Sequence, residues 1–287
     1  MLLSQLKIKF LNLLKEEYKF QEVNSFFNLL TESYLGMNRL DFALNPGKEL
    51  SSGEKEKFEA AIYRLSQHEP IQYILGETEF FGLKFKVDEN VLIPRPETEE
   101  LVQWILGDVA ESKTPLKLKI LDIGTGSGCI AISLTKNLPN AEIFALDISE
   151  KALKIAKENA RLNKVNINFI QADILNLEAL IGKFDVIVSN PPYVREMEKA
   201  EMHRNVLENE PDLALYVKDT DPLIFYRKIT KLAQAGLQKS GNLYFEINQY
   251  LAKETEEILK DSGFKTRLKK DIFGNYRMLR GSKKSNH

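Results

Sequence analysis

The chain has 287 residues, of which 43% are hydrophobic and 28% charged, and its formal net charge is −1. This balance is typical of a globular protein with a sizeable core, makes two domains reasonable, and disfavours a nucleic-acid groove as the main feature. The single cysteine, Cys129, excludes a disulfide framework within the chain and a cysteine-rich metal site. The three histidines lack metal-binding spacing, no apolar run is long enough to span a membrane, and the charged N-terminus does not have the layout of a signal peptide. We therefore expect a cytoplasmic protein without a metal site or membrane partner.

The first part of the chain, residues 1–75, is predicted to be a small helical bundle. Apolar side chains recur at helical spacing over 3–14 and again over 23–35. Ser51 and Glu54 have the spacing of a capping box, which predicts the start of a further helix. This region shows no cluster of residues that is typical of a catalytic site. The region either packs against the rest of the chain or docks a partner, and we favour docking.

Residues 76–92 alternate apolar residues with lysines, which predicts a β-hairpin that links two domains and turns at Phe80-Phe81-Gly82. Two prolines then enclose Arg95 in a stiff, charged segment that leads into a helix over 99–106. We expect this segment to cover the site and count Arg95 as a candidate substrate-binding residue. A polar connection over 107–115 follows.

The next stretch is a strand, a glycine turn and a helix. Residues 118–123 form an apolar run of strand length, and the glycines after it allow a sharp turn that brings the backbone close to a ligand. The carboxylate of Asp122 is unsuited to a pyrophosphate and suits the positive end of S-adenosylmethionine. The pattern therefore favours this cofactor over a nicotinamide dinucleotide, with a purely structural turn as the alternative. The candidate cofactor-binding residues are Asp122, Gly124, Thr125, Gly126, Ser127 and Gly128.

Two further predicted strands each end near an acidic residue. The strand over 141–146 leads into Asp147, about twenty residues after the glycines, which is the usual separation for an acid that binds ribose hydroxyls. Ser149 is a candidate N-cap for a helix over 150–162. The strand over 167–171 ends near Asp173, which is placed to meet the adenine amino group. The alternatives are helix-start electrostatics for Asp147 and a plain loop acid for Asp173. We add their neighbours to the cofactor set, Ile148 and Ile174.

The most informative stretch is 184–193, a buried strand that ends in Asn190-Pro191-Pro192-Tyr193. Two prolines remove two backbone donors and make the turn stiff, and the residue before a proline is held extended. A planar NH2 group can then donate to the Asn190 oxygen and a proline carbonyl while it stacks on Tyr193. Such a turn is suited to methylation of a conjugated nitrogen. We count its four residues as catalytic and substrate-binding, with Asn190 also beside the cofactor.

The remainder is predicted to complete a mostly parallel α/β sheet with an antiparallel edge. The predicted elements are a long charged loop over 194–220, a helix over 221–235, a strand over 243–247, a helix over 250–261, paired edge strands over 264–269 and 276–280, and a frayed tail over 281–287.

With these motifs in place, the chain resembles the HemK-like protein-(glutamine-N5) methyltransferases that modify peptide chain release factors. The resemblance runs from about Glu69 to Gly281 and also includes the helical N-terminal region. NPPY alone is shared with DNA adenine methyltransferases, but its combination with IPRPETE and EPDLAL is much narrower. One departure is Asn209, where the family often has phenylalanine. The motifs are EPIQYILG, LIPRPETEELV, LDIGTGSGCIAISL, ALDIS, SNPPYV, ENEPDLAL and D-x-x-G-x-x-R from Asp271 to Arg277.

The resemblance implies a Rossmann-like class I S-adenosylmethionine-dependent methyltransferase. Its substrate would be the glutamine of the GGQ motif in class I release factors, and its products would include S-adenosylhomocysteine. We expect a monomer that makes no direct contact with nucleic acid. The expected organisation is a release-factor-docking domain over 1–75, a linker over 76–92, a catalytic domain over 93–281 and a tail over 282–287. The alternatives are an adenine-N6 nucleic-acid methyltransferase and a non-catalytic S-adenosylmethionine-binding protein.

Overall fold

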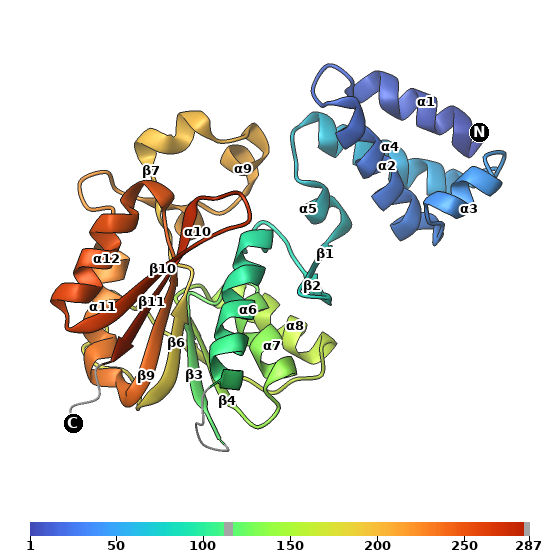
Figure 1. Ribbon diagram of the computed structural model, residues 1–287. Helices are drawn as coiled ribbons and strands as arrows, with labels where there is room; N and C mark the ends of the chain where they lie inside the picture. Colours follow the sequence, from blue (N-terminus) through green and yellow to red (C-terminus); the bar gives the residue numbers. More distant parts are fainter. Residues whose placement is uncertain (112–116, 284–287) are drawn as a thin grey trace. The chain divides into compact units, whose positions relative to one another are not determined.

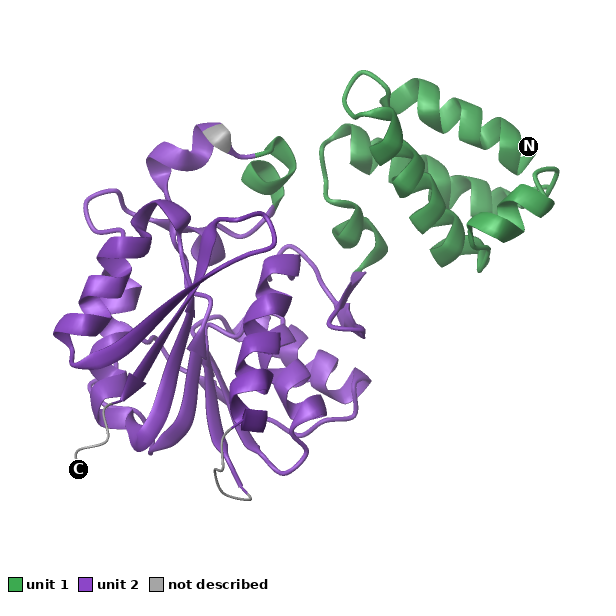
Figure 2. Cartoon of the chain, in the orientation of Figure 1, with its two compact units in different colours: residues 1–76, 203–209 green, residues 77–202, 210–287 purple. Residues whose placement is uncertain are grey.

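The computed structural model describes residues 1–111 and 117–283, apart from the side chain of Glu201. These residues form two compact units (Figure 2). The first unit contains residues 1–76 and 203–209, and the second contains 77–202 and 210–287. The chain therefore passes between the units three times. None of the described helices is both long and apolar enough to cross a membrane.

The first unit is helical, as predicted. Its core is a single cluster that includes Leu3, Phe10, Phe27 and Phe58, each fully buried. Leu13, although it fits the helical spacing, is 53% exposed. The helices are α1 (Leu3–Leu14), α2 (Phe20–Leu35), α3 (Arg39–Leu44), α4 (Ser52–Ser66), α5 (Ile71–Leu75) and α9 (Arg204–Asn209).

The predicted capping box is present at the start of α4. Ser51 Oγ accepts a hydrogen bond from the Glu54 backbone N–H at 3.2 Å, and the Glu54 carboxylate accepts one from the Ser51 N–H at 2.8 Å. Farther along the chain, Asn209 Nδ2 in α9 donates to the backbone carbonyl of His68 at 3.1 Å. The residue that departs from the family pattern therefore ties α9 to the loop after α4.

The predicted hairpin is present in the second unit as β1 (Glu77–Phe80) and β2 (Leu83–Lys86), which pair antiparallel around Phe81 and Gly82. Phe80 and Phe85 are fully buried in the same cluster as the central sheet. Their burial anchors the hairpin to the second unit.

The second unit is built on a seven-stranded sheet in the order β10-β11-β9-β6-β3-β4-β5 (Figure 1). Every neighbouring pair is parallel except those made by β11, which is reversed next to the outermost strand. The mostly parallel sheet with an antiparallel edge is thus confirmed. The strands are β3 (Lys119–Ile123), β4 (Glu142–Asp147), β5 (Asn168–Gln171), β6 (Phe184–Ser189), β9 (Leu237–Glu246), β10 (Phe264–Lys270) and β11 (Tyr276–Lys283).

Helices cover both faces of this sheet because alternate strand residues point in opposite directions. Ile120 of β3 packs in the cluster that contains α6 (Pro96–Glu111), α7 (Cys129–Asn137) and part of α8 (Glu150–Leu162). The next residue, Leu121, packs in the opposite cluster with α11 (Ile224–Gly236) and α12 (Ala252–Asp261). Figure 1 shows these two helical layers with the sheet between them.

The prediction of one long charged loop over 194–220 is wrong. This segment forms short elements that include a parallel two-stranded pair, and each is too short to give a clear periodicity in the sequence. The elements are β7 (Val194–Arg195), the 3-10 helix η1 (Glu196–Glu201), α9, α10 (Asp212–Leu215) and β8 (Tyr216–Val217).

Several predicted boundaries also need correction. The helix expected over 99–106 begins at Pro96, since a proline fits the first helical turn, and continues to Glu111. The predicted connection therefore begins later, and its residues 112–115 lie outside the described part. The helix expected from 221 begins at Ile224, and the 3-10 helix η2 (Gln249–Leu251) precedes α12. The expected tail is partly strand, because β11 continues to Lys283; residues 284–287 are not described.

Candidate active site

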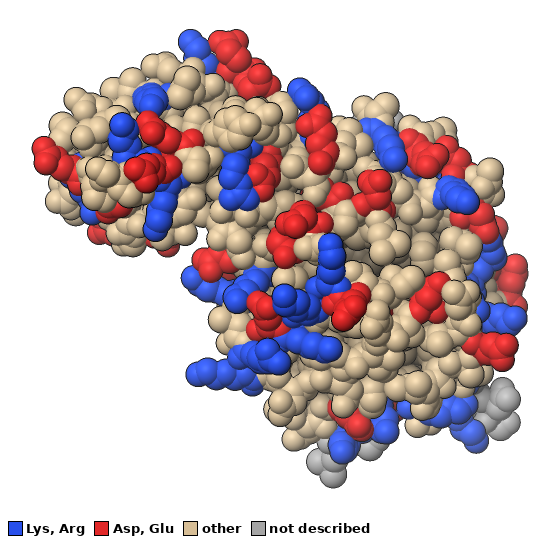
Figure 3. Space-filling view, turned by 180° about the vertical axis from the view of Figure 1, so that it is seen from behind, with Lys and Arg blue, Asp and Glu red and all other residues tan. Residues whose placement is uncertain are grey.

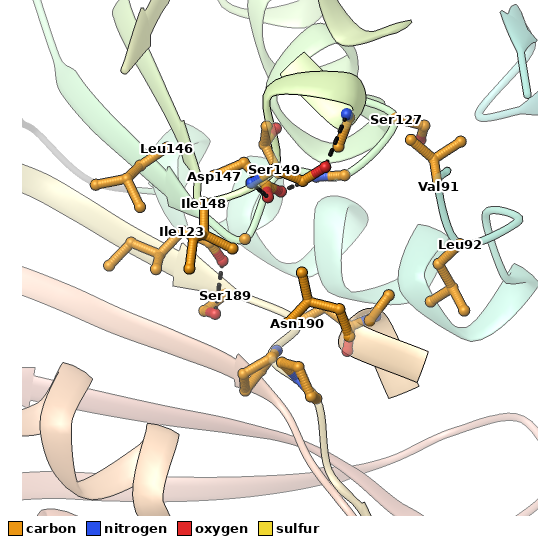
Figure 4. Close-up of a pocket in the computed structure, with 18 of the residues that line it drawn as sticks. Val91, Leu92, Ile123, Ser127, Leu146, Asp147, Ile148, Ser149, Ser189 and Asn190 are labelled. Atoms are coloured by element: carbon orange, nitrogen blue, oxygen red, sulfur yellow. Dashed lines mark hydrogen bonds between the residues drawn. The ribbon is translucent and has the colours of Figure 1, made fainter. Parts of the chain in front are cut away.

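A cavity of about 420 Å³ lies in the second unit at the carboxyl ends of β3, β4 and β6. This size is within the range of small-molecule sites, about 300–1,000 Å³. Parallel strands place their carboxyl ends at one edge of a sheet, so turns that are far apart in sequence meet there. Figure 4 shows Asp147 at the end of β4, with Ile148 and Ser149 after it, on the same side of the sheet as Ser189 at the end of β6 and the following Asn190.

The glycine turn after β3 forms one wall of the cavity. Gly126 has a φ of +54°, which favours glycine, and its N–H donates to the Asp147 carboxylate at 2.8 Å. A Cβ added at Gly126 would have no atom within 4 Å, so the backbone of the turn is open to a ligand. Thr125 and Ser127 also line the cavity. A Cβ added at Gly124 would come within 4.0 Å of the Asn190 backbone oxygen, which shows how closely the two turns approach.

Gly128 differs from the prediction, because it does not line the cavity. A Cβ at this position would lie 3.0 Å from the Ile132 side chain and 3.2 Å from that of Ala156. The structure therefore assigns Gly128 to the close packing of α7 against α8.

Asp122 also differs from the prediction. It is fully buried behind the turn and is not part of the cavity wall. One carboxylate oxygen accepts a hydrogen bond from Thr125 Oγ1 at 2.7 Å, and the backbone N–H of Ala131 in the first turn of α7 also favours the charged form of this carboxylate. Burial raises the pKa of this carboxyl to about 7. The side chain points into the layer under α7, as strand alternation requires, so within these residues Asp122 orders the turn. Its contact with the cofactor stays a prediction.

Asp147 lies where the ribose-binding prediction places it, at the end of β4 and in the cavity wall. It is 9% exposed, and its carboxylate accepts hydrogen bonds from the backbone N–H groups of Gly126 at 2.8 Å and Ser149 at 2.9 Å. Burial raises its pKa, and the two backbone donors oppose that shift. A carboxylate has about four lone-pair sites, so two remain for ligand hydroxyls.

The other predicted cofactor-binding residues after β4 and β5 also line the cavity, namely Ile148, Asp173 and Ile174. Ile148 is 44% exposed, and Ile174 is buried. Asp173 accepts hydrogen bonds from the Leu175 N–H at 2.9 Å and from Asn176 Nδ2 at 2.7 Å. Asp173 therefore shapes its own loop, and its contact with adenine stays a prediction.

The turn after β6 contributes Asn190, Pro191 and Pro192 to the cavity wall. Tyr193 does not line it. Its ring packs against the core cluster that contains α11, and its hydroxyl donates to Glu246 Oε1 at 3.0 Å. The expected stacking surface is thus not supplied by Tyr193 in this cavity, because the buried carboxylate holds the ring elsewhere.

Two residues at the site were not predicted, Thr98 and Glu246. Thr98 Oγ1 donates to Glu246 Oε2 at 2.6 Å, and Asn190 Nδ2 lies 3.4 Å from the same Thr98 oxygen. Glu246 is only 1% exposed at the end of β9. The sequence did contain one signal for Glu246, because this carboxylate lies inside the apolar run LYFEI. A charge buried in such a run requires hydrogen-bond or ionic partners, which is typical of a functional site.

Arg95 lines the cavity, and its guanidinium is committed to an ion pair. It donates to Glu210 Oε1 at 2.6 Å, and Glu210 Oε2 accepts from the Ile93 N–H at 3.3 Å. The pair joins the segment before α6 to the segment that contains α10. A direct contact of Arg95 with substrate stays a prediction. Further cavity residues that the sequence did not single out are Val91, Leu92, Leu213, Ala214, Phe225 and Ile229.

The residues present fit S-adenosylmethionine. The open backbone at Gly126 accommodates a ligand that lies flat on the turn, and Asp147 offers acceptors for ribose hydroxyls. Apolar side chains such as Ile148 and Leu175 offer surfaces to a purine ring. In the described part of the chain, no group of three or more His, Cys, Asp or Glu side chains is placed to hold a metal ion.

Comparisons with known proteins agree with this arrangement. Residues 116–274 match the Methyltransferase domain family, and residues 10–76 match the PrmC N-terminal domain family. A similar solved structure is a T. thermophilus 16S rRNA N2 G1207 methyltransferase in complex with AdoMet and guanosine. It has a TM-score of 0.53 and 18% identity over 72% of this chain and 50% of that chain. At this identity, the likeness shows the fold alone, that of a Rossmann-like methyltransferase.

Sequence relatives are much closer. A release factor glutamine methyltransferase of Flavobacterium psychrophilum is 54% identical over 98% of this chain and 99% of its own. One from Bacteroides thetaiotaomicron is 45% identical over 93% of this chain and 95% of its own. The chain therefore belongs to the release factor glutamine methyltransferases, a family of S-adenosylmethionine-dependent enzymes.

Proposed function

We propose that this protein transfers a methyl group from S-adenosylmethionine to the side-chain amide nitrogen of the glutamine in the GGQ motif of class I release factors. The observation that carries the proposal is that Asn190, Pro191 and Pro192 share one cavity with the glycine turn and Asp147. In this proposal, the site for the planar amide adjoins the site for the cofactor. The names of the relatives support a release factor glutamine as the acceptor.

The main task of the protein is to orient a weak nucleophile. The lone pair of an amide nitrogen is delocalised into its carbonyl, so the nitrogen must be held in line with the methyl group at near-attack distance. In the proposed complex, Asn190 Oδ1 and the Pro191 carbonyl accept the two amide hydrogens. Both acceptors are fixed by the proline turn and favour the positive charge that develops on the nitrogen. The bound cofactor supplies an electrophilic methyl group on a sulfonium.

The site does not require a strong base or a covalent nucleophile. The nitrogen can release its proton to water after transfer, when it is acidic. Cys129 also lines the cavity, but burial raises the pKa of its thiol to about 12, so it stays protonated. Its place at the start of α7 suits a small packing residue.

The proposal includes a monomer that acts in the cytoplasm on class I release factors without direct contact with nucleic acid. On the face shown in Figure 3, basic and acidic side chains are interspersed. This pattern supports a protein substrate over a nucleic-acid groove, which would need clustered positive charge.

The decisive experiment is mass spectrometry of purified release factors after incubation with the protein and isotopically labelled S-adenosylmethionine. We expect one labelled methyl group on the GGQ glutamine. Replacement of Asn190 with Ala should slow transfer by at least about a hundredfold, the scale of one lost transition-state hydrogen bond. Cofactor binding by calorimetry should change little. A parallel reaction with DNA or RNA in place of the release factor tests the alternative. Label in the nucleic acid would support an adenine-N6 methyltransferase, and cofactor binding without turnover would support a non-catalytic role.

A further inference from the structure

A chain of hydrogen bonds connects Asn190 to a carboxylate on a different strand. Asn190 Nδ2 lies 3.4 Å from Thr98 Oγ1, and Thr98 Oγ1 lies 2.6 Å from Glu246 Oε2. Thr98 is 2% exposed in the first turn of α6, and Glu246 is 1% exposed at the end of β9. The first of these bonds is at the long end of the hydrogen-bond range.

The number of protons on each group determines which atom donates in each of these hydrogen bonds. Both neighbouring hydroxyls donate to Glu246, Thr98 Oγ1 to Oε2 and Tyr193 O–H to Oε1, so the single hydroxyl proton of Thr98 points to the carboxylate. Thr98 can then offer only an acceptor to Asn190, and only the NH2 group of Asn190 can satisfy it. The side-chain oxygen of Asn190 must therefore face away from Thr98. Within the described residues, no group donates to that oxygen.

The same carboxylate also holds the other end of the proline turn. Tyr193 O–H donates to Glu246 Oε1 at 3.0 Å. The two prolines lie between these two anchored residues, so Glu246 constrains the first and the last residue of Asn190-Pro191-Pro192-Tyr193. The carboxylate acts on Asn190 only through Thr98.

We propose that Thr98 and Glu246 are positioning residues, which hold the side-chain amide of Asn190 with its oxygen toward the target nitrogen. The inference rests on the proposed function, because it assumes that Asn190 accepts a hydrogen bond from the substrate amide. Without the Thr98 hydroxyl, the Asn190 amide is free to rotate by 180°. Its NH2 group would then face the NH2 group of the substrate, and the hydrogen bond would be lost.

Matched substitutions at the two hydroxyls test this role. Thr98→Val removes the hydroxyl and keeps the shape, Thr98→Ser keeps the hydroxyl, and Tyr193→Phe removes the other hydrogen bond to Glu246. On a short GGQ peptide, we expect Thr98→Val to lower kcat by at least about tenfold, with KM and cofactor Kd within about twofold. Thr98→Ser should stay within about threefold of the wild-type kcat, and Tyr193→Phe should lose less than Thr98→Val. Wild-type kcat for Thr98→Val, or equal loss for Thr98→Ser, would overturn the proposal.

A double-mutant cycle tests whether Thr98 acts through Asn190. Thr98→Val should cost little further rate in the Asn190→Ala background, since the group that it orients is already absent. An equal factor in both backgrounds would contradict the relay. This outcome is distinct from failure of the proposed function, in which the wild-type protein itself would not methylate the peptide.

A spectroscopic readout does not depend on activity. The side-chain amide resonance of Asn190, assigned by its absence in Asn190→Ala, should shift in Thr98→Val and stay near its position in Tyr193→Phe. An unchanged Asn190 resonance in Thr98→Val would show that the hydroxyl does not hold the amide.

Discussion

At the scale of single residues, Glu246 stands out because a carboxylate at 1% exposure is costly to keep ionised. Burial raises its pKa above the ordinary 4.5, while the hydrogen bonds from Thr98 and Tyr193 and the nearby Arg277 oppose the shift. A carboxyl whose pKa is higher in the folded than in the unfolded state stabilises the fold when protonated. That contribution is complete below the unfolded pKa and is lost as the pH rises through the folded pKa.

Glu246→Gln should therefore keep or raise the free energy of unfolding at neutral pH while it slows methyl transfer. Glutamine has no charge to bury, but it has one acceptor oxygen where the carboxylate accepts from two hydroxyls. One hydroxyl must reverse or lose its partner, and we expect kcat to fall by about tenfold. Urea unfolding at pH 7 and near pH 4.5, together with single-turnover rates on a GGQ peptide, measures both effects. A variant that is less stable at pH 7 but equally fast would show that the carboxylate only supports the fold.

The residues that could be predicted are those with a local signal. The glycine turn, Asp147 and the proline turn each combine an unusual local sequence with the end of a strand. Thr98 and Glu246 were not predicted as site residues, because they are 148 positions apart and become neighbours only when α6 packs against β9. Tyr193 was misplaced for the same reason, since its hydroxyl partner lies 53 positions away.

At the scale of elements, two segments of the cavity wall are joined by one ion pair. Arg95 precedes α6, and Glu210 precedes α10; their side chains are 32% and 1% exposed, and the nitrogen–oxygen distance is 2.6 Å. Glu210 also accepts from the Ile93 N–H. The Glu210 carboxylate is so deeply buried that its charge is tolerated only with its partners in place. The ion pair therefore couples the positions of the two segments.

Arg95→Ala should destabilise the protein by about 1–3 kcal/mol, below the full value for a buried pair because Arg95 is partly exposed. The loss arises because Glu210 stays buried without its counter-charge, so Arg95→Ala/Glu210→Gln should recover part of it. Cofactor affinity should weaken as the segments loosen. Arg204→Ala is the control, since it breaks an i,i+4 pair with side chains 66% and 45% exposed and should change stability by less than about 0.5 kcal/mol. Urea unfolding gives the comparison, and an Arg95→Ala variant as stable as Arg204→Ala would remove the coupling role.

At the scale of the whole molecule, the sequence predicted a helical region and an α/β region, but it did not predict which residues make up the first unit. Residues 203–209 belong to that unit, although they lie within the catalytic half of the sequence. A helix of six residues has too few turns to display an apolar face, and its partner at His68 lies 141 positions from Asn209. Contacts over such separations are set by tertiary structure and leave no local pattern.

The docking role that we propose for residues 1–75 can be tested by removal of the first unit. The cavity is lined entirely by residues of the second unit, which has its own core clusters. A variant that lacks residues 1–76 and carries a short Gly/Ser linker in place of 203–209 should therefore bind S-adenosylmethionine within about twofold of wild type. If the first unit docks the substrate, methylation of an intact release factor should fall by at least about a hundredfold, since a second binding contact multiplies apparent affinity on that scale. A short GGQ peptide should lose much less. Calorimetry and circular dichroism establish that the second unit is folded, and initial rates on both substrates give the comparison. Equal losses on the intact factor and the peptide would mean that the helical unit supports the catalytic unit and does not dock the partner.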